Sequence, residues 1–324
     1  MALRPRAPAR RAPLLACLAL ALGAACAQRV DEGELALREL EGLAFVPAER
    51  VLIDSFLRLL LYENPQPLLV ERFELTRGQW REFAAARPDA VGAPLRERML
   101  AWASEDDDRP ATFMTQEEAR ACADWRGMRL LSSDEWLLCA LGPERRQYPW
   151  DAYERRDSVA NTLELGLGRT CAVGTFEGGR TPRGLYDMLG NVAEWCSDDV
   201  EARRMPALLR RGEPRCSALG GSFRTWSRPI FRQVTAGDAG DRPYLAHRLD
   251  PRSRQDDVGL RCAVPAREYL RERAARLPGD AASRARLVAV GRRWGRAAAA
   301  LLVDLCAEPG APAALTALRE GAEG

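Results

Sequence analysis

The residues best suited to do chemistry lie in the stretch GLYDMLGNVAEWCSDD, residues 184–199. Two carboxylates, Asp187 and Glu194, flank a Gly-Asn turn at Gly190 and Asn191. The stretch is too broken for a long helix and lacks the alternation of a strand. A bend between carboxylates offers side-chain and carbonyl oxygens, which suits a hard cation. The alternative is that Glu194 simply pairs with an arginine.

Three short helices are predicted ahead of this stretch, each beginning at a Ser or Thr N-cap. Residues 74–86 (ELTRGQWREFAAA) are capped by Thr76, and residues 114–128 (MTQEEARACADWRGM) are capped by Thr115 and end at Gly127. Residues 132–142 (SSDEWLLCALG) are capped by Ser132 or Ser133 and end at Gly142. Beyond Pro143 we expect mostly loops and short strands.

Composition divides the 324-residue chain into four regions. We assign residues 1–27 to a signal, 28–44 to an acidic helical lead-in, 45–265 to the main domain and 266–324 to an Arg/Ala/Leu-rich tail. The tail predicts two amphipathic helices, broken at Pro278-Gly279, that dock on the main domain. Contact of its arginines with anionic lipid headgroups is the alternative.

The N-terminus, MALRPRAPARRAPLLACLALALGAAC, has an arginine-rich start followed by a short apolar run, which is typical of an export signal. Cys26 after LGAA resembles a bacterial lipoprotein cleavage site, although Gly23 replaces the usual Leu. Lipidation of Cys26, with membrane attachment, and plain cleavage around Ala25 or Ala27 both remain open. Either outcome predicts a periplasmic or membrane-anchored protein, in a compartment where cysteines can pair.

The single histidine, His247, limits the sites that this chain can form alone. Metal sites with two or three histidines, and most histidine-based acid/base schemes, are excluded unless a partner supplies ligands. All 48 basic residues are arginine, which we attribute to GC-rich coding. The net charge of +2 is small, and we expect no nucleic-acid partner.

Seven motifs occur in one order along the chain: FELTRGQWREF, RGMRLLSSDEWLLCALG, YPWDA, ANT, GLYDMLGNVAEW, GGSF and VGLRC. In this register they resemble the formylglycine-generating-enzyme family, also called the sulfatase-modifying-factor family. The resemblance covers about residues 45–265. It implies an α+β fold, a variant of the C-type lectin fold with little regular secondary structure, to which this chain adds a helical C-terminal tail.

The resemblance also implies a structural calcium in the 184–199 stretch. The ligands implied by position are the carboxylates of Asp187 and Glu194 and the backbone carbonyls of Gly190 and Val192. A second family calcium site would lie near Asn161 and Thr162. We expect it to be lost, because its acid aligns near Leu165.

A disulfide between Cys122 and Cys262 is implied by relatives with half-cystines at these positions. The sequence cannot choose among the three pairings of Cys139, Cys171, Cys196 and Cys216, with Cys196–Cys216 slightly favoured. Each bridge would add about 2–4 kcal/mol. Cys306 is left over.

Catalytic members of the family oxidise a substrate cysteine to formylglycine with two thiolates that hold copper(I). The matching positions in GGSFRTWSRPIF, residues 220–231, are Thr225 and Ile230. Neither can bind copper(I), which prefers sulfur, nor form a mixed disulfide with a substrate. We therefore expect no copper and no formylglycine generation.

The same region forms a ligand-binding groove in other family members. Here the groove residues would be Ser222, Arg224, Thr225, Trp226, Ser227 and Arg228. Aromatic, arginine and hydroxyl side chains suit a peptide, a glycan or a carboxylate. Alternatively, Trp226 packs in the core and the arginines form salt bridges. Asp198 and Asp199 could add an acid pair, or could be satisfied by Arg203 and Arg204.

These observations predict an exported, calcium-stabilised binding or accessory module for a peptide, glycan or envelope partner. A family enzyme with a cysteine-free reaction on a protein or small metabolite is the rival hypothesis, and a structural lipoprotein of the cell envelope is a third. An ordered acid/base pair with perturbed pKa values around Asp198, Asp199 and Thr225 would favour the enzyme. An aromatic–arginine surface without them would favour binding.

Overall fold

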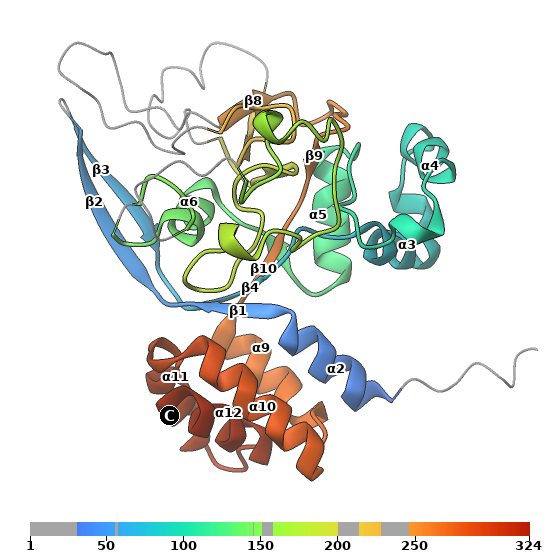
Figure 1. Cartoon of the computed structure of the whole chain (residues 1–324). Coiled ribbons are helices and arrows are strands. Elements are labelled where there is room, and N and C mark those ends of the chain that lie inside the picture. Colours follow the sequence, from blue (N-terminus) through green and yellow to red (C-terminus); the bar gives the residue numbers. More distant parts are fainter. Residues whose placement is uncertain (1–30, 56–57, 145, 151–157, 200–213, 228–245) are drawn as a thin grey trace, which may run out of the picture.

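A computed structural model describes residues 31–55, 58–144, 146–150, 158–199, 214–227 and 246–324 (Figure 1). The predicted signal with Cys26, and the predicted site positions Arg228 and Ile230, lie outside these ranges, as do Arg203 and Arg204.

The described strands form two small sheets and a separate hairpin. One sheet has the order β1 (Leu43–Val46), β4 (Leu68–Glu71), β10 (Cys262–Pro265) and β5 (Arg129–Leu130), all antiparallel. The other has the order β8 (Ala246–Leu249), β7 (Cys216–Leu219), β6 (Ala193–Trp195) and β9 (Val258–Gly259), with β6 and β9 parallel. Strands β2 (Glu49–Ser55) and β3 (Arg58–Asn64) form the hairpin, which the sequence analysis did not predict.

The three predicted N-caps are confirmed. Helices α3 (Arg77–Ala86), α5 (Gln116–Trp125) and α6 (Ser133–Leu141) begin with capping boxes at Thr76, Thr115 and Ser132. In each box the Ser or Thr oxygen accepts the N3 amide, while the Gln or Glu at N3 accepts the N-cap amide. Gly127 and Gly142 have positive φ beyond the second and third helices, as predicted for helix ends. Helix α4 (Ala93–Leu100) was not predicted.

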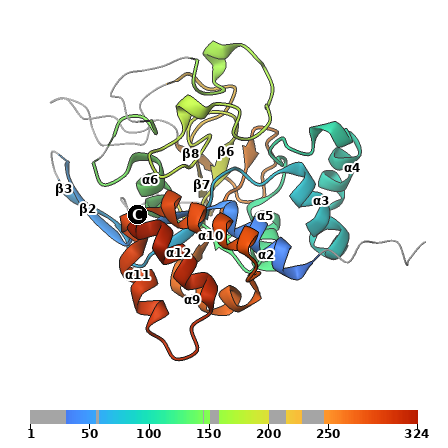
Figure 2. The ribbon, with the colours of Figure 1, turned by 60° about the horizontal axis from the view of Figure 1, so that its bottom comes forward.

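The lead-in and the tail form a helical layer on one side of the β1–β4–β10 strands (Figures 1 and 2). Its helices are α2 (Glu32–Glu41), α9 (Ala266–Arg273), α10 (Ala281–Trp294), α11 (Arg296–Cys306) and α12 (Ala313–Glu323). The single long helix predicted after Pro278-Gly279 is wrong. Gly295, at φ 62°, ends α10 and begins α11, because such a backbone cannot continue a right-handed helix.

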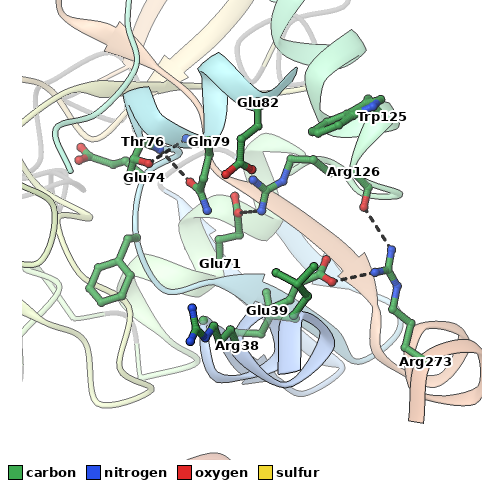
Figure 3. A pocket seen from close by; sticks show the side chains of 14 residues that line it. Arg38, Glu39, Glu71, Glu74, Thr76, Gln79, Glu82, Trp125, Arg126 and Arg273 are labelled. Atoms are coloured by element: carbon green, nitrogen blue, oxygen red, sulfur yellow. Dashed lines mark hydrogen bonds and ion pairs between the residues drawn. The ribbon is translucent and has the colours of Figure 1, made fainter. Parts of the chain in front are cut away.

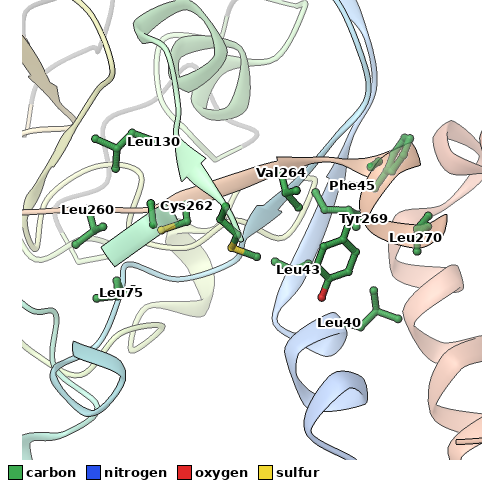
Figure 4. Close-up of a cluster of buried hydrophobic side chains, with 14 of the residues drawn as sticks. Leu40, Leu43, Phe45, Leu75, Leu130, Leu260, Cys262, Val264, Tyr269 and Leu270 are labelled. Carbon is green, nitrogen blue, oxygen red and sulfur yellow. The ribbon is translucent and has the colours of Figure 1, made fainter. Parts of the chain in front are cut away.

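The tail docks on the main domain of its own chain, as predicted. Figure 4 shows Tyr269 and Leu270 of α9 beside Leu43 and Phe45 of β1, and all four side chains are buried. Trp294 packs its ring against Phe45 at 6.1 Å and donates from Nε1 to the Leu43 carbonyl at 3.1 Å.

Arginines of the tail are paired with acids of α2. Arg286 binds Glu34 and Glu41, and Arg273 binds Glu39. These pairs place several tail arginines against protein carboxylates instead of lipid headgroups. No helix in the described ranges is both long and apolar enough to cross a membrane.

Candidate functional site

The 184–199 stretch folds as a tight, buried loop around the predicted turn. Gly190 and Asn191 both have positive φ, at 89° and 53°. A Cβ on Gly190 would lie 2.5 Å from the Asn161 carbonyl oxygen, so this position requires glycine. Asn191 is fully buried and donates from Nδ2 to Glu74 at 2.7 Å, while its Oδ1 accepts from Asn161 and from the Cys171 amide.

Glu194 forms a buried ion pair with Arg261 instead of an open cation ligand. The Arg261 Nε lies 3.0 and 3.1 Å from the two carboxylate oxygens, and its Nη2 lies 2.7 Å from Oε1. Trp136 also donates from Nε1 to Oε2 at 2.6 Å. The side chains of the ion pair are 1% and 0% exposed.

Carbonyl oxygens complete the coordination of this guanidinium. Arg261 donates from Nη1 to Glu71 at 2.9 Å and from Nη2 to Tyr186 at 2.7 Å. Burial acts to lower the pKa of Arg261, but the charge and hydrogen bonds of Glu194 raise it overall. The pair is therefore a satisfied, charged core element.

The predicted calcium ligand Glu194 does not fit an open cation site, because Arg261 and Trp136 bind its carboxylate oxygens. A cation at Glu194 would have to displace Arg261 and Trp136 from both carboxylate oxygens. Across the described residues, no group of three or more His, Cys, Asp or Glu side chains is arranged to hold a metal. Asp187 binds the Gly174 amide at 2.7 Å, and the Val192 amide donates to Glu74 at 3.1 Å. The alternative that Glu194 pairs with an arginine describes the loop correctly.

Two further acids are buried in the same loop cluster. Burial raises the pKa of Asp187 to about 6, and burial with the charges of Asp187 and Glu194 raises that of Glu74 well above its usual value. At the second family calcium position, the buried oxygens Asn161 Oδ1 and Thr162 Oγ1 lack a hydrogen-bond partner in the described chain.

The Gly-Gly-Ser segment forms a turn stabilised by Thr225, the residue that the sequence predicted at the first thiolate position. The Thr225 hydroxyl accepts the Ser222 amide at 2.8 Å and donates to the Ser222 carbonyl at 2.9 Å. Ser222 donates from Oγ to Asp257 at 2.8 Å, and the Ser227 amide donates to Glu164 at 2.7 and 2.9 Å. Thr225 therefore stabilises a turn.

The surface beside this turn is apolar and exposed. Trp226 is 52% exposed, so the alternative that it packs in the core is wrong. Leu163 and Leu167 are 41% and 46% exposed, and the Leu163 amide donates to the Thr225 carbonyl. Arg224 does form the expected salt bridge, to Asp256 at 2.8 and 3.1 Å, and it also lies over the Phe223 ring at 4.9 Å.

Asp198 and Asp199 have separate structural contacts. Asp198 accepts the amide and hydroxyl of Ser133, at the start of α6, at 2.7 and 2.8 Å. Asp199 is buried and pairs with Arg248 at 2.6 Å. Neither carboxylate is free to act in the acid pair considered from the sequence.

The predicted disulfide between Cys122 and Cys262 is absent, because both residues are free thiols in the core. Both are completely buried. Burial raises the pKa of Cys122 to about 12 and that of Cys262 well above its usual value. Cys196 and Cys216, favoured as a second pair, are also free.

A pocket of about 530 Å³ lies between α2, α3 and the end of α5 (Figure 3). Its charged side chains mainly pair with one another: Arg126 binds Glu71 at 2.5 Å, and Arg273 binds Glu39 at 2.7 Å. Figure 3 shows Glu82 pointing toward Arg126. This pocket is therefore largely an internal ion-pair network beside the exposed ring of Trp125.

Comparison with known proteins identifies the class. Residues 62–266 match the family model described as sulfatase-modifying factor enzyme 1-like domain, and the chain belongs to this family. The fold is likewise that of the family: the chain resembles the crystal structure of CarF with a TM-score of 0.50 and 17% identity, over 69% of this chain and 98% of that one.

Two relatives show the range of proteins that share this domain. Hercynine oxygenase of Mycobacterium tuberculosis is 34% identical over 155 residues, covering 40% of this chain and 36% of that protein. The inactive C-alpha-formylglycine-generating enzyme 2 of Bos taurus is 26% identical over 200 residues, covering 59% and 57%. The chain thus spans between about a third and three fifths of the length of these relatives.

Proposed function

We propose that this chain is a family member without formylglycine-generating chemistry that binds a peptide, glycan or envelope partner through the surface around Trp226. The observation that carries the proposal is the self-bonded turn of Ser222 and Thr225 at the thiolate position, next to the exposed side chains of Trp226, Leu163 and Leu167.

Three features support binding over catalysis. A threonine hydroxyl that closes its own turn offers no soft ligand for copper(I). The nearby acids Asp198 and Asp199 cap a helix and pair with an arginine. Tryptophan is among the residues that contribute most strongly to protein interfaces, and Trp226 is 52% exposed. The similarity to a relative named as inactive agrees with this proposal.

We further propose that the protein is exported, either lipidated at Cys26 or cleaved nearby. The basic and apolar N-terminal sequence supports this proposal. Metabolic labelling with a fatty acid, comparing the chain with its Cys26→Ala variant, tests lipidation. Calcium bound through Glu194 is not part of the proposal, since Arg261 occupies that carboxylate.

The test screens the purified protein against peptide and glycan arrays and then measures the affinity of the best ligand for matched variants. Trp226→Ala should weaken binding at least about tenfold, which is about 1.4 kcal/mol. Trp125→Ala removes a similarly exposed tryptophan from a different surface and should leave the affinity unchanged. Equal loss in both variants would contradict the proposed surface. Oxygen consumption on a cysteine-containing peptide with copper(I) would contradict the loss of chemistry.

A further inference from the structure

A second cavity, of about 280 Å³, lies where the family domain meets the C-terminal helices. The loop after Glu177 and the end of α10 both contribute to its wall. Its charged lining consists of four arginines and one glutamate: Arg72, Arg180, Arg183, Arg293 and Glu177. Such an excess of positive charge inside a concave site raises the local concentration of anions.

Two of these arginines are neutralised by the protein. Arg180 pairs with Glu177, which also accepts the Tyr186 hydroxyl. Arg183 pairs with Glu49. Arg72 and Arg293 form no ion pair with any carboxylate in the described part of the chain. The cavity therefore retains two guanidinium groups without a direct ion pair, on which the carboxylates of Glu177 and Glu41 act only at longer range.

Arg72 is held in place by groups that do not cancel its charge. Its guanidinium lies 5.2 Å from the centre of the Phe73 ring and 5.4 Å from that of Tyr186. Its Nε donates to the Gly184 carbonyl at 3.3 Å. Among the described contacts, neither Nη group of Arg72 donates a hydrogen bond. The guanidinium is therefore held in place while both Nη groups remain able to bind an anion.

Arg293 is anchored in the same way, because its Nη2 donates to the Glu41 carbonyl at 2.9 Å. Although Arg293 is exposed at the surface, partial desolvation of its guanidinium, followed by the positive charge of Arg72, lowers its pKa. The two cations are thus close enough to repel each other. An arginine in the last turn of α10 also complements the helix dipole, but this effect does not account for Arg72 on another part of the fold.

We propose that this cavity binds the phosphate or sulfate group of a small molecule between Arg72 and Arg293. A tetrahedral oxyanion accepts forked hydrogen bonds from two guanidinium groups and removes their mutual repulsion. Because Arg293 lies beyond the family match at 62–266, the site depends on the C-terminal helices as well as the family domain. It is independent of the surface around Trp226.

Calorimetric titration of the full chain with inorganic phosphate and with sulfate, at low and constant ionic strength, tests the proposal. We expect saturable binding of one anion per chain. Arg72→Gln and Arg293→Gln should each weaken it at least about tenfold, the effect of one charge-assisted hydrogen-bond donor. Arg292→Gln is the matched control, because it removes an exposed charge at the next position of α10 outside the cavity.

Several results would overturn the proposal. The first is that neither phosphate nor sulfate binds. The second is that chloride binds as tightly as they do. The third is that Arg292→Gln weakens binding as much as the two cavity variants, which would indicate that binding depends on the overall positive charge and not on this cavity. Titration with phosphatidylglycerol vesicles distinguishes the source of the anion, since binding to vesicles without binding of either free anion would refute a small-molecule site. Arg293→Gln changes an exposed position, so it keeps the test valid if Arg72→Gln fails to fold.

Discussion

The buried pair of Glu194 and Arg261 yields the sharpest test of how this family domain is stabilised here. Glu194→Gln keeps the shape of the side chain but removes the counter-charge of a fully buried guanidinium. Removing one partner of a buried ion pair typically costs 3–5 kcal/mol, because the remaining charge stays desolvated. We therefore expect the free energy of unfolding to fall by about 3–5 kcal/mol, measured by urea denaturation with linear extrapolation.

Two control variants make this experiment specific. Glu320→Gln breaks an exposed pair with Arg284, whose side chains are 44% and 47% exposed, and should cost no more than about 1 kcal/mol. The double variant Glu194→Gln/Arg261→Met removes both charges. It should recover part of the lost stability, since an apolar side chain does not need a partner in the core.

The dependence of stability on calcium is the measurement that could refute the ion-pair interpretation of Glu194. If Glu194 were a calcium ligand, added calcium would stabilise the wild-type protein in proportion to its occupancy, and a chelator would remove that gain. The geometry predicts no such dependence through Glu194. A cost below about 1 kcal/mol for Glu194→Gln, or a calcium-dependent gain that this variant abolishes, would refute the ion-pair interpretation.

Three further predictions concern a buried acid, the packing of the tail and the thiols. Because the pKa of Asp187 in the folded protein, about 6, lies above the ordinary aspartate value of 3.8, its protonation stabilises the fold at low pH, and this contribution is lost as the pH rises through about 6. Asparagine tolerates the backbone conformation of this position, φ 56°. In urea denaturation, Asp187→Asn should therefore match the stability of the wild type near pH 4 and exceed it by up to about 3 kcal/mol at pH 8. A difference in stability that does not change with pH would contradict this prediction. A Cβ on Gly291 would overlap the Leu318 carbonyl, so Gly291→Ala should lower the free energy of unfolding by about 1–3 kcal/mol, measured by thermal or urea unfolding. Gly279 has open space around it, so Gly279→Ala should change stability by less than about 0.5 kcal/mol. Equal effects of the two variants would contradict the close crossing of α10 and α12. Cys122 and Cys262 should resist a thiol reagent in the native protein and react in urea without a reductant, as mass spectrometry of labelled peptides can show; labelling only after reduction would instead demonstrate the disulfide.

Local chemistry made the helix starts and the Gly-Asn turn predictable from the sequence. A capping box spans four residues, and the hydroxyl and the amide or carboxylate side chain that form it are visible in the sequence. The helix break at Gly295 was missed because the apolar pattern continues through it. The β2–β3 hairpin was also missed, because its strands contain few residues with high β-propensity, chiefly Val51, Ile53 and Tyr62.

The partners of the buried acids could not be predicted in the same way. Arg261 lies 67 positions from Glu194, and Glu74 lies 117 positions from Asn191. A carboxylate in a bend has the same sequence signature whether it binds a cation or an arginine. Only the fold places β9, and Arg261 just after it, beside Glu194 in β6, and so gives this carboxylate an arginine partner, whereas the Gly-Asn turn itself could be predicted from adjacent residues.

The two proposed sites have different origins within one molecule. The surface at Trp226 lies within the segment that matches the family domain, beside the turn that Thr225 closes with Ser222. The arginine cavity, by contrast, needs α10, whose Trp294 and Arg293 are fixed to the backbone of residues 41–43. Because the same contacts dock the tail and complete the cavity, anion binding and tail docking must be thermodynamically linked. An anion that binds between Arg72 and Arg293 therefore stabilises the attachment of the C-terminal helices to the family domain.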